Sequence, residues 1–279
     1  MSDSTFPPGL YIVATPIGNL SDLSPRASDV LKNADRILAE DKRVTAKLLR
    51  HIGADTPMTA YHDHSDGTLR ERVLADLGDK RIALVSDAGT PLISDPGYKL
   101  VRAARAAGLA VHTVPGPSAA IAALTLAGLP TDRFLFVGFL PAKAKARAEV
   151  IAEIAPIRAS LILYESGPRL GASLAALAEG IGERDAAVVR EISKLHEETV
   201  TGSLLQLAER YAETGPKGEI VIVVGPPAAP SEATEDDLDA AIDEALTRLS
   251  PSRAAAEVAE RLGIKKKRAY ARALERSGH

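Results

Sequence analysis

The chain has 279 residues, of which 46% are hydrophobic and 25% charged, and its net charge is −3. This is the composition of a globular protein with an ample core, and it excludes a polycation, so nucleic-acid binding would rest on local basic patches. The absence of cysteine excludes disulfides, thiolate metal ligands and a cysteine nucleophile.

Strand-like and helix-like segments alternate over residues 10–114. Ser24 followed by Pro25 predicts a helix start, because serine caps a helix N-terminus and proline fits the first turn. The alternation is typical of a mostly parallel sheet covered by helices on both faces. The predicted strands are residues 10–14, 36–39, 58–61, 82–85 and 111–114, and the predicted helices are residues 25–33, 44–51, 68–77 and 98–107.

A second series follows Pro115-Gly116-Pro117-Ser118, a natural hinge. We therefore predict an α/β fold of two lobes, residues 1–116 and 117–227, with mostly parallel or mixed sheets. A cleft between lobes is a preferred place for a small-molecule site. The strands predicted in the second lobe are residues 134–139, 161–164, 188–192 and 220–224, and the helices are residues 145–155, 169–178 and 204–212.

Nothing in the sequence predicts membrane contact. The stretch Met1–Thr5 lacks the basic start and apolar core of a signal peptide. The most apolar segment, residues 119–129, is too short to span a bilayer. We therefore expect a cytoplasmic protein.

The tail differs from the rest of the chain. Residues 226–230 form a proline-rich, stiff linker. Residues 232–249 then carry seven acidic side chains and one arginine, whereas residues 250–279 carry eight Lys or Arg and three Glu. We predict a small helical extension over residues 231–279, with a helix–turn–helix at 251–262 and 265–276; the alternative is a pair of solvated amphipathic helices. The cluster Lys265, Lys266, Lys267 and Arg268 is the strongest local candidate for phosphate contacts.

The loop Ser86–Gly97 is the most informative stretch of the chain. It directly follows the apolar run 82–85 and reads Ser-Asp-Ala-Gly-Thr-Pro-Leu-Ile-Ser-Asp-Pro-Gly. Glycines allow the backbone to approach a ligand closely, prolines stiffen the loop, and Asp87 and Asp95 bracket it with charge. Because open α/β sheets bind ligands beyond the carboxyl ends of their strands, this loop predicts a ligand site.

Other predicted strands also end in polar or turn-forming residues. Residues 14–20 form a proline- and glycine-containing loop, and residues 40–43, 164–169 and 190–198 are rich in charge. Each could be solvated surface, but their shared position at strand ends favours one common site.

Familiar nucleotide and hydrolase motifs are missing. The sequence has no G-x-x-x-x-G-K-[ST], no G-x-G-x-x-G after the first strand, and neither H-E-x-x-H nor G-x-S-x-G. His62, Asp63 and His64 could suggest a metal-dependent hydrolase, but a metal site needs three or four ligands and this group is incomplete. We therefore expect no metal, and keep the hydrolase as an alternative.

Several stretches, taken in order, resemble the tetrapyrrole methylase superfamily, and more closely its branch of ribosomal RNA small-subunit methyltransferases I. The resemblance covers about residues 10–225, and the tail resembles that branch's C-terminal extension. The sequence departs from the pattern at Lys42, where threonine is expected, at Gly167-Pro168, where proline-histidine is expected, and in the alanine-rich loop 141–147. The matching stretches are residues 14–20, 40–41, 61–62, 86–97, 114–119, 164–166, 194–197 and 217–219.

The resemblance implies a homodimer that binds S-adenosylmethionine between its lobes and methylates the 2′-hydroxyl of a cytidine in the decoding region of 16S rRNA, within the small ribosomal subunit. It places the donor against Thr15, Pro16, Gly18, Asp87, Gly89, Thr90, Pro91, Ile93, Ser118 and Ala119. The RNA is expected to meet Arg43, Lys143, Lys145, Arg147, Lys194, Lys265, Lys266, Lys267 and Arg268.

Methyl transfer to a hydroxyl depends on alignment and on removal of a proton. We expect Lys194 to stabilise the oxyanion and Glu165 to act as base, with His196 and Asp41 in reserve. Two alternatives stay open: an acceptor that is a small tetrapyrrole or a protein side chain, and an RNA-binding protein of this fold without catalysis.

Overall fold

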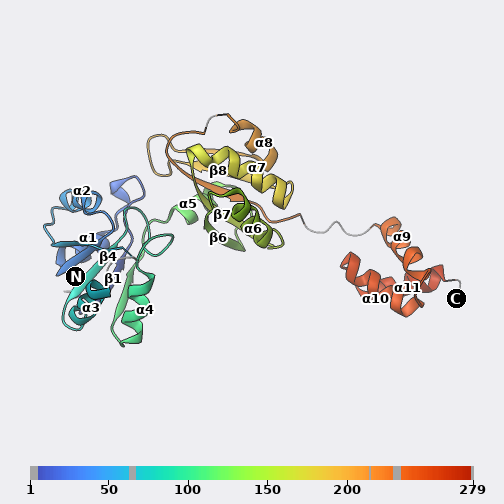
Figure 1. Ribbon diagram of the computed structural model, residues 1–279, viewed down its shortest axis with the longest axis horizontal. Helices are drawn as coiled ribbons and strands as arrows, with labels where there is room; N and C mark the ends of the chain where they lie inside the picture. The colour runs from blue at the N-terminus through green and yellow to red at the C-terminus, as the bar shows by residue number, and fades with distance from the viewer. Residues whose placement is uncertain (1–5, 63–66, 214, 229–233, 278–279) are drawn as a thin grey trace. The chain divides into compact units, whose positions relative to one another are not determined.

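The computed structural model describes residues 6–62, 67–213, 215–228 and 234–277. The chain divides into two compact units between Pro226 and Pro227. The first unit contains two five-stranded sheets with their helices, and the second unit contains helices in its described part (Figure 1).

The first sheet is wholly parallel, with the strand order β3-β2-β4-β1-β5. Successive side chains along a strand point to opposite faces of the sheet, and each face has its own hydrophobic core. Ile82 and Leu84 share a core with residues of helices α3 and α4, whereas Ala83 and Val85 share a core with residues of α1 and α2. The elements are β1 (Gly9–Val13), α1 (Pro25–Asn33), β2 (Arg36–Ala39), α2 (Lys42–Ile52), β3 (Met58–Ala60), α3 (Gly67–Asp76), β4 (Arg81–Val85), α4 (Tyr98–Ala106) and β5 (Val111–Val114).

The boundaries of the first helices follow local signals. The Ser24 hydroxyl accepts a hydrogen bond from the backbone N–H of Ala27, and Pro25 occupies the first turn, which confirms the predicted start of α1. Helix α2 ends at Gly53, whose φ of 68° is the left-handed conformation that glycine adopts at low cost.

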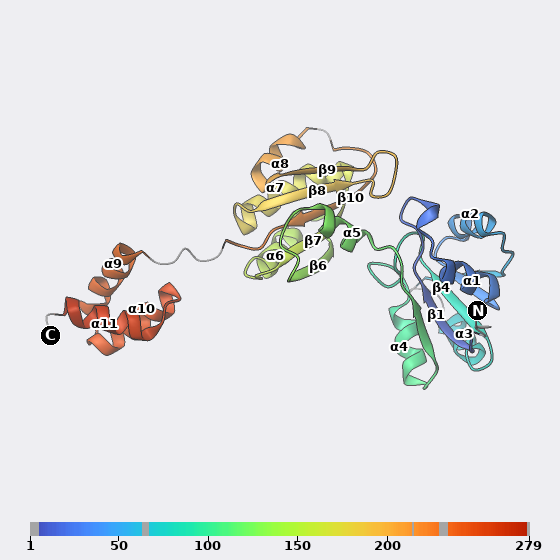
Figure 2. The same cartoon turned by 180° about the vertical axis from the view of Figure 1, so that it is seen from behind.

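The second sheet is mixed, with the order β6-β7-β10-β8-β9 (Figure 2). Strands β6 and β7 are parallel and the other pairs are antiparallel. Because β10 is antiparallel to β7 and β8, its first residues lie beside their last: Glu219 pairs with Ser166 and Ile220 with Arg190. The elements are β6 (Phe134–Phe139), α6 (Ala144–Ile154), β7 (Ser160–Ser166), α7 (Leu170–Ile181), β8 (Asp185–Arg190), β9 (Glu198–Ser203), α8 (Leu204–Arg210) and β10 (Glu219–Val224); short 3₁₀ turns lie at Leu20–Asp22 and Gly167–Arg169.

Two elements escape the sequence-based prediction. Helix α5 (Ala119–Leu126) is apolar on every side, so it lacks the amphipathic period that indicates a helix; it packs on β7 and β10 in a core of its own. Strand β9 begins at Glu198, the last residue of the charged run 190–198. This run was predicted to follow a strand; it also leads into the next strand and forms the loop of a β8–β9 hairpin.

The second unit contains α9 (Glu235–Leu246), α10 (Pro251–Leu262) and α11 (Lys266–Arg276), which confirms the predicted helix–turn–helix. The two helices do not stand alone, because the acidic segment forms a third helix that packs with them. All three helices share a buried, alanine-rich core that includes Ala241, Ala254 and Ala269.

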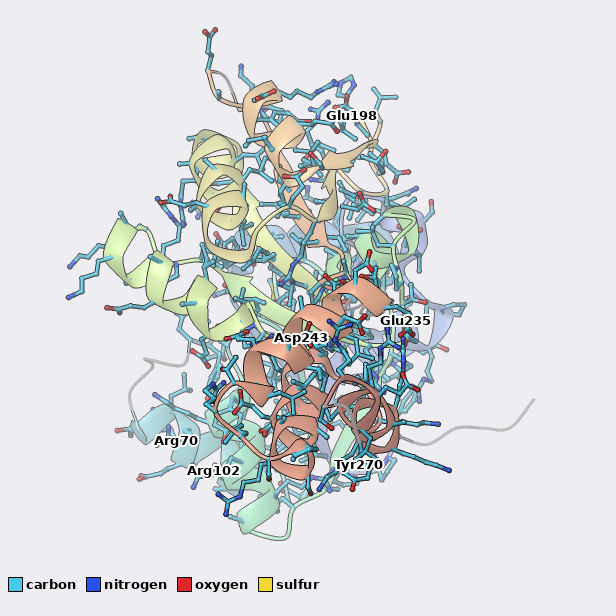
Figure 3. All side chains as sticks on the ribbon, turned by 90° about the vertical axis from the view of Figure 1, so that its right-hand side faces the viewer. Arg70, Arg102, Glu198, Glu235, Asp243 and Tyr270 are labelled. Carbon is cyan, nitrogen blue, oxygen red and sulfur yellow. The ribbon has the colours of Figure 1, made fainter. Side chains whose placement is uncertain are left out.

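Ion pairs join the acidic and basic helices of this unit. Glu235, Asp239 and Asp243 lie four residues apart along α9, two of them labelled in Figure 3. On α11, Arg268 pairs with Glu235 at 2.7 Å, Arg272 with Asp239 at 2.5 Å, and Arg276 with Asp243. The opposite charges of the two tail segments therefore partly neutralise each other within the unit.

In the part of the chain that the structure describes, no helix combines the length and the apolar character needed to cross a membrane.

Candidate active site

The loops that follow β1 and β4 are bound to each other by their backbones. The N–H of Thr15 donates to the carbonyl of Gly89 at 2.9 Å, and the N–H of Gly89 donates to the carbonyl of Thr15 at 3.1 Å. The strands are neighbours in the sheet, so their carboxyl ends bring these loops together. Gly89 has a φ of 80°, which a residue with a Cβ adopts only under strain.

A cavity of about 350 Å³ opens beside this pair of loops and lies between the two sheets. The loop after β4 and the start of α5 form one wall, and the ends of β6 and β7 with the beginning of β10 form the other. Most of its lining is apolar, with a few polar groups, as is usual for small-molecule sites. The lining residues are Ile17, Ala88, Gly89, Thr90, Ile93, Ser94, Asp95, Ser118, Ala119, Phe139, Tyr164, Glu165, Ser166, Ile192, Gly218, Glu219, Ile220 and Val221.

A second cavity of about 510 Å³ is lined mainly by the loop after β1 and by α2. It shares Ile17, Ala88 and Glu219 with the first cavity, so the two are neighbours. Its lining residues are Thr15, Pro16, Ile17, Gly18, Leu20, Val44, Thr45, Lys47, Leu48, Ser86, Asp87, Ala88, Lys194 and Glu219.

Contacts between the two halves of the first unit surround these cavities. The Thr90 hydroxyl donates to the carbonyl of Pro117 at 2.9 Å. Ile17, from the first half, packs into the apolar core formed by α5 and the second sheet. The Ser193 hydroxyl donates to the Asp22 carboxylate. The walls of the site are therefore held together by polar and apolar contacts.

Comparison with known proteins assigns the chain to a family. The model of the tetrapyrrole (corrin/porphyrin) methylases matches residues 9–208, and that of the RsmI C-terminal HTH domain matches residues 232–277. The ribosomal RNA small subunit methyltransferase I of Erythrobacter litoralis (strain HTCC2594) is 55% identical over 270 residues, which cover 96% of this chain and 95% of the relative. This chain belongs to the ribosomal RNA small subunit methyltransferase I family.

A second member of the family, from Mesorhizobium japonicum (strain LMG 29417 / CECT 9101 / MAFF 303099), is 46% identical and covers 96% of this chain and 92% of its own. Among solved structures, a uroporphyrin-III C-methyl transferase from Thermus thermophilus, complexed with S-adenyl homocysteine, has a TM-score of 0.52 at 21% identity. The alignment covers 78% of this chain and 97% of that protein, and it supports the tetrapyrrole methylase fold.

In this chain, the residues predicted to bind the donor are divided between the first and the second cavity. Gly89, Thr90, Ile93, Ser118 and Ala119 line the first cavity. Thr15, Pro16, Gly18 and Asp87 line the second cavity, whereas Pro91 is buried and lines neither. Their role in donor binding stays a prediction.

Glu165, the predicted base, lies in the first cavity with its carboxylate already engaged. It accepts hydrogen bonds from the backbone N–H of Ser166 at 2.8 Å and from the Ser173 hydroxyl at 2.5 Å. The Arg169 guanidinium lies 3.5 Å from the same carboxylate, and the Glu165 side chain is buried. These contacts hold the β7 end against α7, and a role as proton acceptor stays a prediction.

Lys194, the predicted oxyanion stabiliser, lines the second cavity. Its ammonium forms ion pairs with Glu191 at 2.9 Å and Glu219 at 2.8 Å. Burial alone would lower the pKa of Lys194, but hydrogen bonds and charge from these two carboxylates outweigh it and raise the pKa above the ordinary value. Lys194 is therefore a fixed cation at neutral pH, and the structure brings it beside a different cavity from Glu165.

Phe139 lies at the site although it is not among the residues predicted from the sequence. Strand β6 has a bulge between Phe136 and Gly138, which has a φ of 77°, and such a bulge re-aims the side chain that follows. Phe139 is 56% exposed and lines the first cavity, with its ring edge-to-face against Tyr164 at 5.6 Å between centroids. A glycine inside an apolar strand is the one signal that could have indicated the bulge.

The residues predicted to contact RNA are mostly exposed. Arg43 is paired with Asp41 at 2.6 Å, and the Arg147 Nε is buried without a hydrogen-bond partner. Arg268 is paired with Glu235 on α9, as described above. In the described residues no ion pair involves Lys143, Lys145, Lys265, Lys266 or Lys267.

Of the suggested metal ligands, only His62 is among the described residues; Asp63 and His64 lie outside them. Within residues 6–62, 67–213, 215–228 and 234–277, no group of three or more His, Cys, Asp or Glu is arranged to hold a metal ion.

Gly18→Ala should displace Lys194. A Cβ at position 18 would overlap Lys194 Cγ, so the lysine stem must move and weaken its pairs with Glu191 and Glu219. We expect the free energy of unfolding to fall by about 1–3 kcal/mol, as for other overpacked positions, measured by urea denaturation. At Gly78 a Cβ would meet nothing within 4 Å, so Gly78→Ala is the matched control; equal effects of the two substitutions would contradict the prediction.

Proposed function

We propose that this chain transfers a methyl group from S-adenosylmethionine to the 2′-hydroxyl of a cytidine in the decoding region of 16S rRNA, in the cytoplasm and within the small ribosomal subunit. The observation that carries the proposal is the match along both units, the methylase part over residues 9–208 and the HTH domain over 232–277. A small tetrapyrrole would give no reason for an appended HTH domain, and relatives such as that of Erythrobacter litoralis are named for ribosomal RNA.

The first cavity fits such a donor. Its wall offers the hydroxyls of Thr90 and Ser118 together with apolar contacts from Ile17, Ile93 and Ile220. At Gly89 a Cβ would come within 3.3 Å of Ile17 Cγ2, so the bare backbone there lets Ile17, another lining residue, pack closely against this loop. When bound, S-adenosylmethionine supplies an activated methyl group on a sulfonium.

The residues proposed to hold the donor are the ones that the family resemblance indicates, and they come from both cavities. They are Thr15, Pro16, Gly18, Asp87, Gly89, Thr90, Pro91, Ile93, Ser118 and Ala119. In this proposal Lys194 stabilises the oxyanion as a fixed cation from the neighbouring second cavity, next to Glu219, which lines both cavities.

The rim of the first cavity suits a nucleobase. Phe139 presents a largely exposed aromatic ring beside the lining residues, and single-stranded bases stack on such rings once they are turned out of their helix. The exposed lysines at the start of α6 and at residues 265–267 supply charge for phosphates.

The homodimer is part of this proposal. Helix α5 carries only one polar side chain, Thr125, yet Ile121 is 46% and Leu126 39% exposed. An apolar helix face left open in a single chain is suited to burial against a second copy.

Light scattering of the purified protein should therefore give twice the mass of one chain.

The function is tested by nucleoside mass spectrometry of 16S rRNA from a strain that lacks the gene. We expect the loss of one 2′-O-methylcytidine and its return when the wild-type gene is restored. Survival of every ribose methylation in the deletion strain would refute the RNA assignment.

Phe139→Ala should weaken binding of the acceptor and spare the donor. Loss of base stacking costs about 1–3 kcal/mol, so we expect KM for the RNA to rise roughly 5- to 150-fold. The dissociation constant for S-adenosylmethionine, measured by calorimetry, should stay unchanged, and Phe139→Tyr should retain activity because it keeps the ring. A large loss of donor affinity in Phe139→Ala would instead assign the ring to the donor.

Neutralising the tail lysines should reduce the electrostatic part of RNA binding. In the triple variant Lys265→Ala, Lys266→Ala and Lys267→Ala, we expect the salt dependence of RNA affinity to become shallower by about 0.7 in log–log slope for each phosphate that the lysines no longer neutralise. Filter binding at several salt concentrations measures this slope. An unchanged slope would remove these lysines from the RNA interface, and unchanged donor affinity is the control.

A further inference from the structure

Asp95 differs from the other carboxylates in the wall of the first cavity. The Glu165 carboxylate accepts a hydrogen bond from the Ser173 hydroxyl, and the Glu219 carboxylate forms an ion pair with Lys194. The nearby Ser86 hydroxyl lowers the pKa of Asp95, and it donates a hydrogen bond to the Ala88 carbonyl at 3.3 Å. Across the described residues no ion pair reaches it, which leaves its carboxylate available to a ligand in the cavity.

The backbone around Asp95 is held in an unusual conformation. Leu92 and Ser94 have φ values of 74° and 65°, in the left-handed region that side chains other than glycine occupy only under strain. Such strain persists when the surrounding structure enforces it, and it is concentrated at functional sites. A Cβ at Gly138 would lie 3.3 Å from the Ser94 hydroxyl, so the bulge of β6 packs closely on this turn.

The opposite wall of the cavity comes close to the turn that contains Asp95, because Gly138 packs on the neighbouring Ser94. Burial raises the pKa of the Tyr164 phenol, and the charge of Asp95 raises it further. Phe139, the proposed base-stacking residue, packs against this same Tyr164. Asp95 and Phe139 therefore line the same cavity, the one at which the acceptor nucleoside is proposed to enter.

The electrostatic surroundings make Asp95 a stronger base than an ordinary aspartate. Burial raises the pKa of Asp95 to about 6, the Ser86 hydroxyl lowers it, and the charges of Glu40 and Asp87 raise it. These two neighbours are held in place by hydrogen bonds: Asp87 N–H donates to Glu40 at 3.3 Å, and Asp41 N–H donates to Asp87 at 2.9 Å. A carboxylate of this kind is ionised at neutral pH and is well matched to general base catalysis.

We propose that Asp95 is the general base that removes the proton of the ribose hydroxyl; this rests on the proposed function. The hydroxyl oxygen forms its bond to the methyl carbon while the methyl–sulfur bond breaks, and that electron pair stays on sulfur, which becomes neutral. The hydroxyl proton moves to a carboxylate oxygen of Asp95 and is later released to solvent. This assignment replaces Glu165 as the proton acceptor.

The test is Asp95→Asn in the full-length protein, beside Glu165→Gln. For Asp95→Asn we expect kcat to fall by about 10²- to 10⁴-fold, the usual contribution of a general base, with affinity for S-adenosylmethionine and RNA retained within about twofold. The fold should survive, because the pKa of Asp95 is higher in the folded chain than in the unfolded one. Stability from this group is present at low pH and lost as the pH rises through about 6, so the uncharged asparagine does not destabilise the fold at pH 7.5.

The pH profile separates a base from a structural residue. Wild-type kcat should fall about tenfold per pH unit below about 6, as Asp95 becomes protonated. Glu40→Gln should move this acid limb to lower pH, because it removes one like charge near Asp95. The residual rate of Asp95→Asn should lack this limb.

Three results would overturn the proposal. The first is full kcat in Asp95→Asn, with activity lost in Glu165→Gln. The second is a loss of donor affinity in Asp95→Asn with kcat retained, which would make Asp95 a donor-binding residue. The third is an acid limb that stays in Asp95→Asn. A wild-type protein that methylates no ribose would refute the proposed function itself, and with it the base.

Discussion

The paired backbone bonds between Thr15 and Gly89 are the constraint on which the site depends. They extend the contact of β1 with β4 beyond the end of the sheet, so two loops that are distant in sequence become one rigid surface. The polypeptide can make this pairing because Gly89 tolerates a positive φ and because Thr15 is buried with its hydroxyl near the Ser86 carbonyl. Together with the Thr90 hydrogen bond to the Pro117 carbonyl, this pairing positions the loop 86–97 beside the second sheet.

The second sheet completes the site through its mixed topology. In a wholly parallel sheet, the start of β10 would lie at the opposite edge from the end of β7. The antiparallel direction of β10 instead places Glu219 beside Ser166, and Glu219 in turn holds Lys194. Two groups that the sequence presents as separate charged strand ends thus belong to one wall. Their ion pairs fix the β8–β9 loop, in which Glu191 and Ser193 adopt left-handed backbone conformations.

Charge in the tail has two functions that composition does not separate. The arginines of α11 lie four residues apart and face acidic residues with the same spacing on α9, so they stabilise the bundle. The lysines at 265–267 come before or within the first turn of α11 and stay exposed. Only part of the positive charge in this segment is therefore available for phosphates. Which side chains pair with α9 and which stay exposed depends on how α11 packs around Ala269 and Ala273, not on the number of charges.

The sequence by itself determined the α/β class, most strand and helix positions, the tail helices 251–262 and 265–276, and the loop 86–97 as a ligand-site candidate, because these depend on local periodicity, capping residues and turn chemistry. It did not indicate α5, whose uniformly apolar surface has no period, or β9, which is hidden behind a charged run. The tertiary structure alone decided that Glu165 and Lys194 line different cavities and that Phe139 turns out at a bulge. It also decided that, of the three carboxylates lining the first cavity, Asp95 has no ion pair with another described residue. These features arise from contacts between segments far apart in the chain, and no local pattern encodes such contacts.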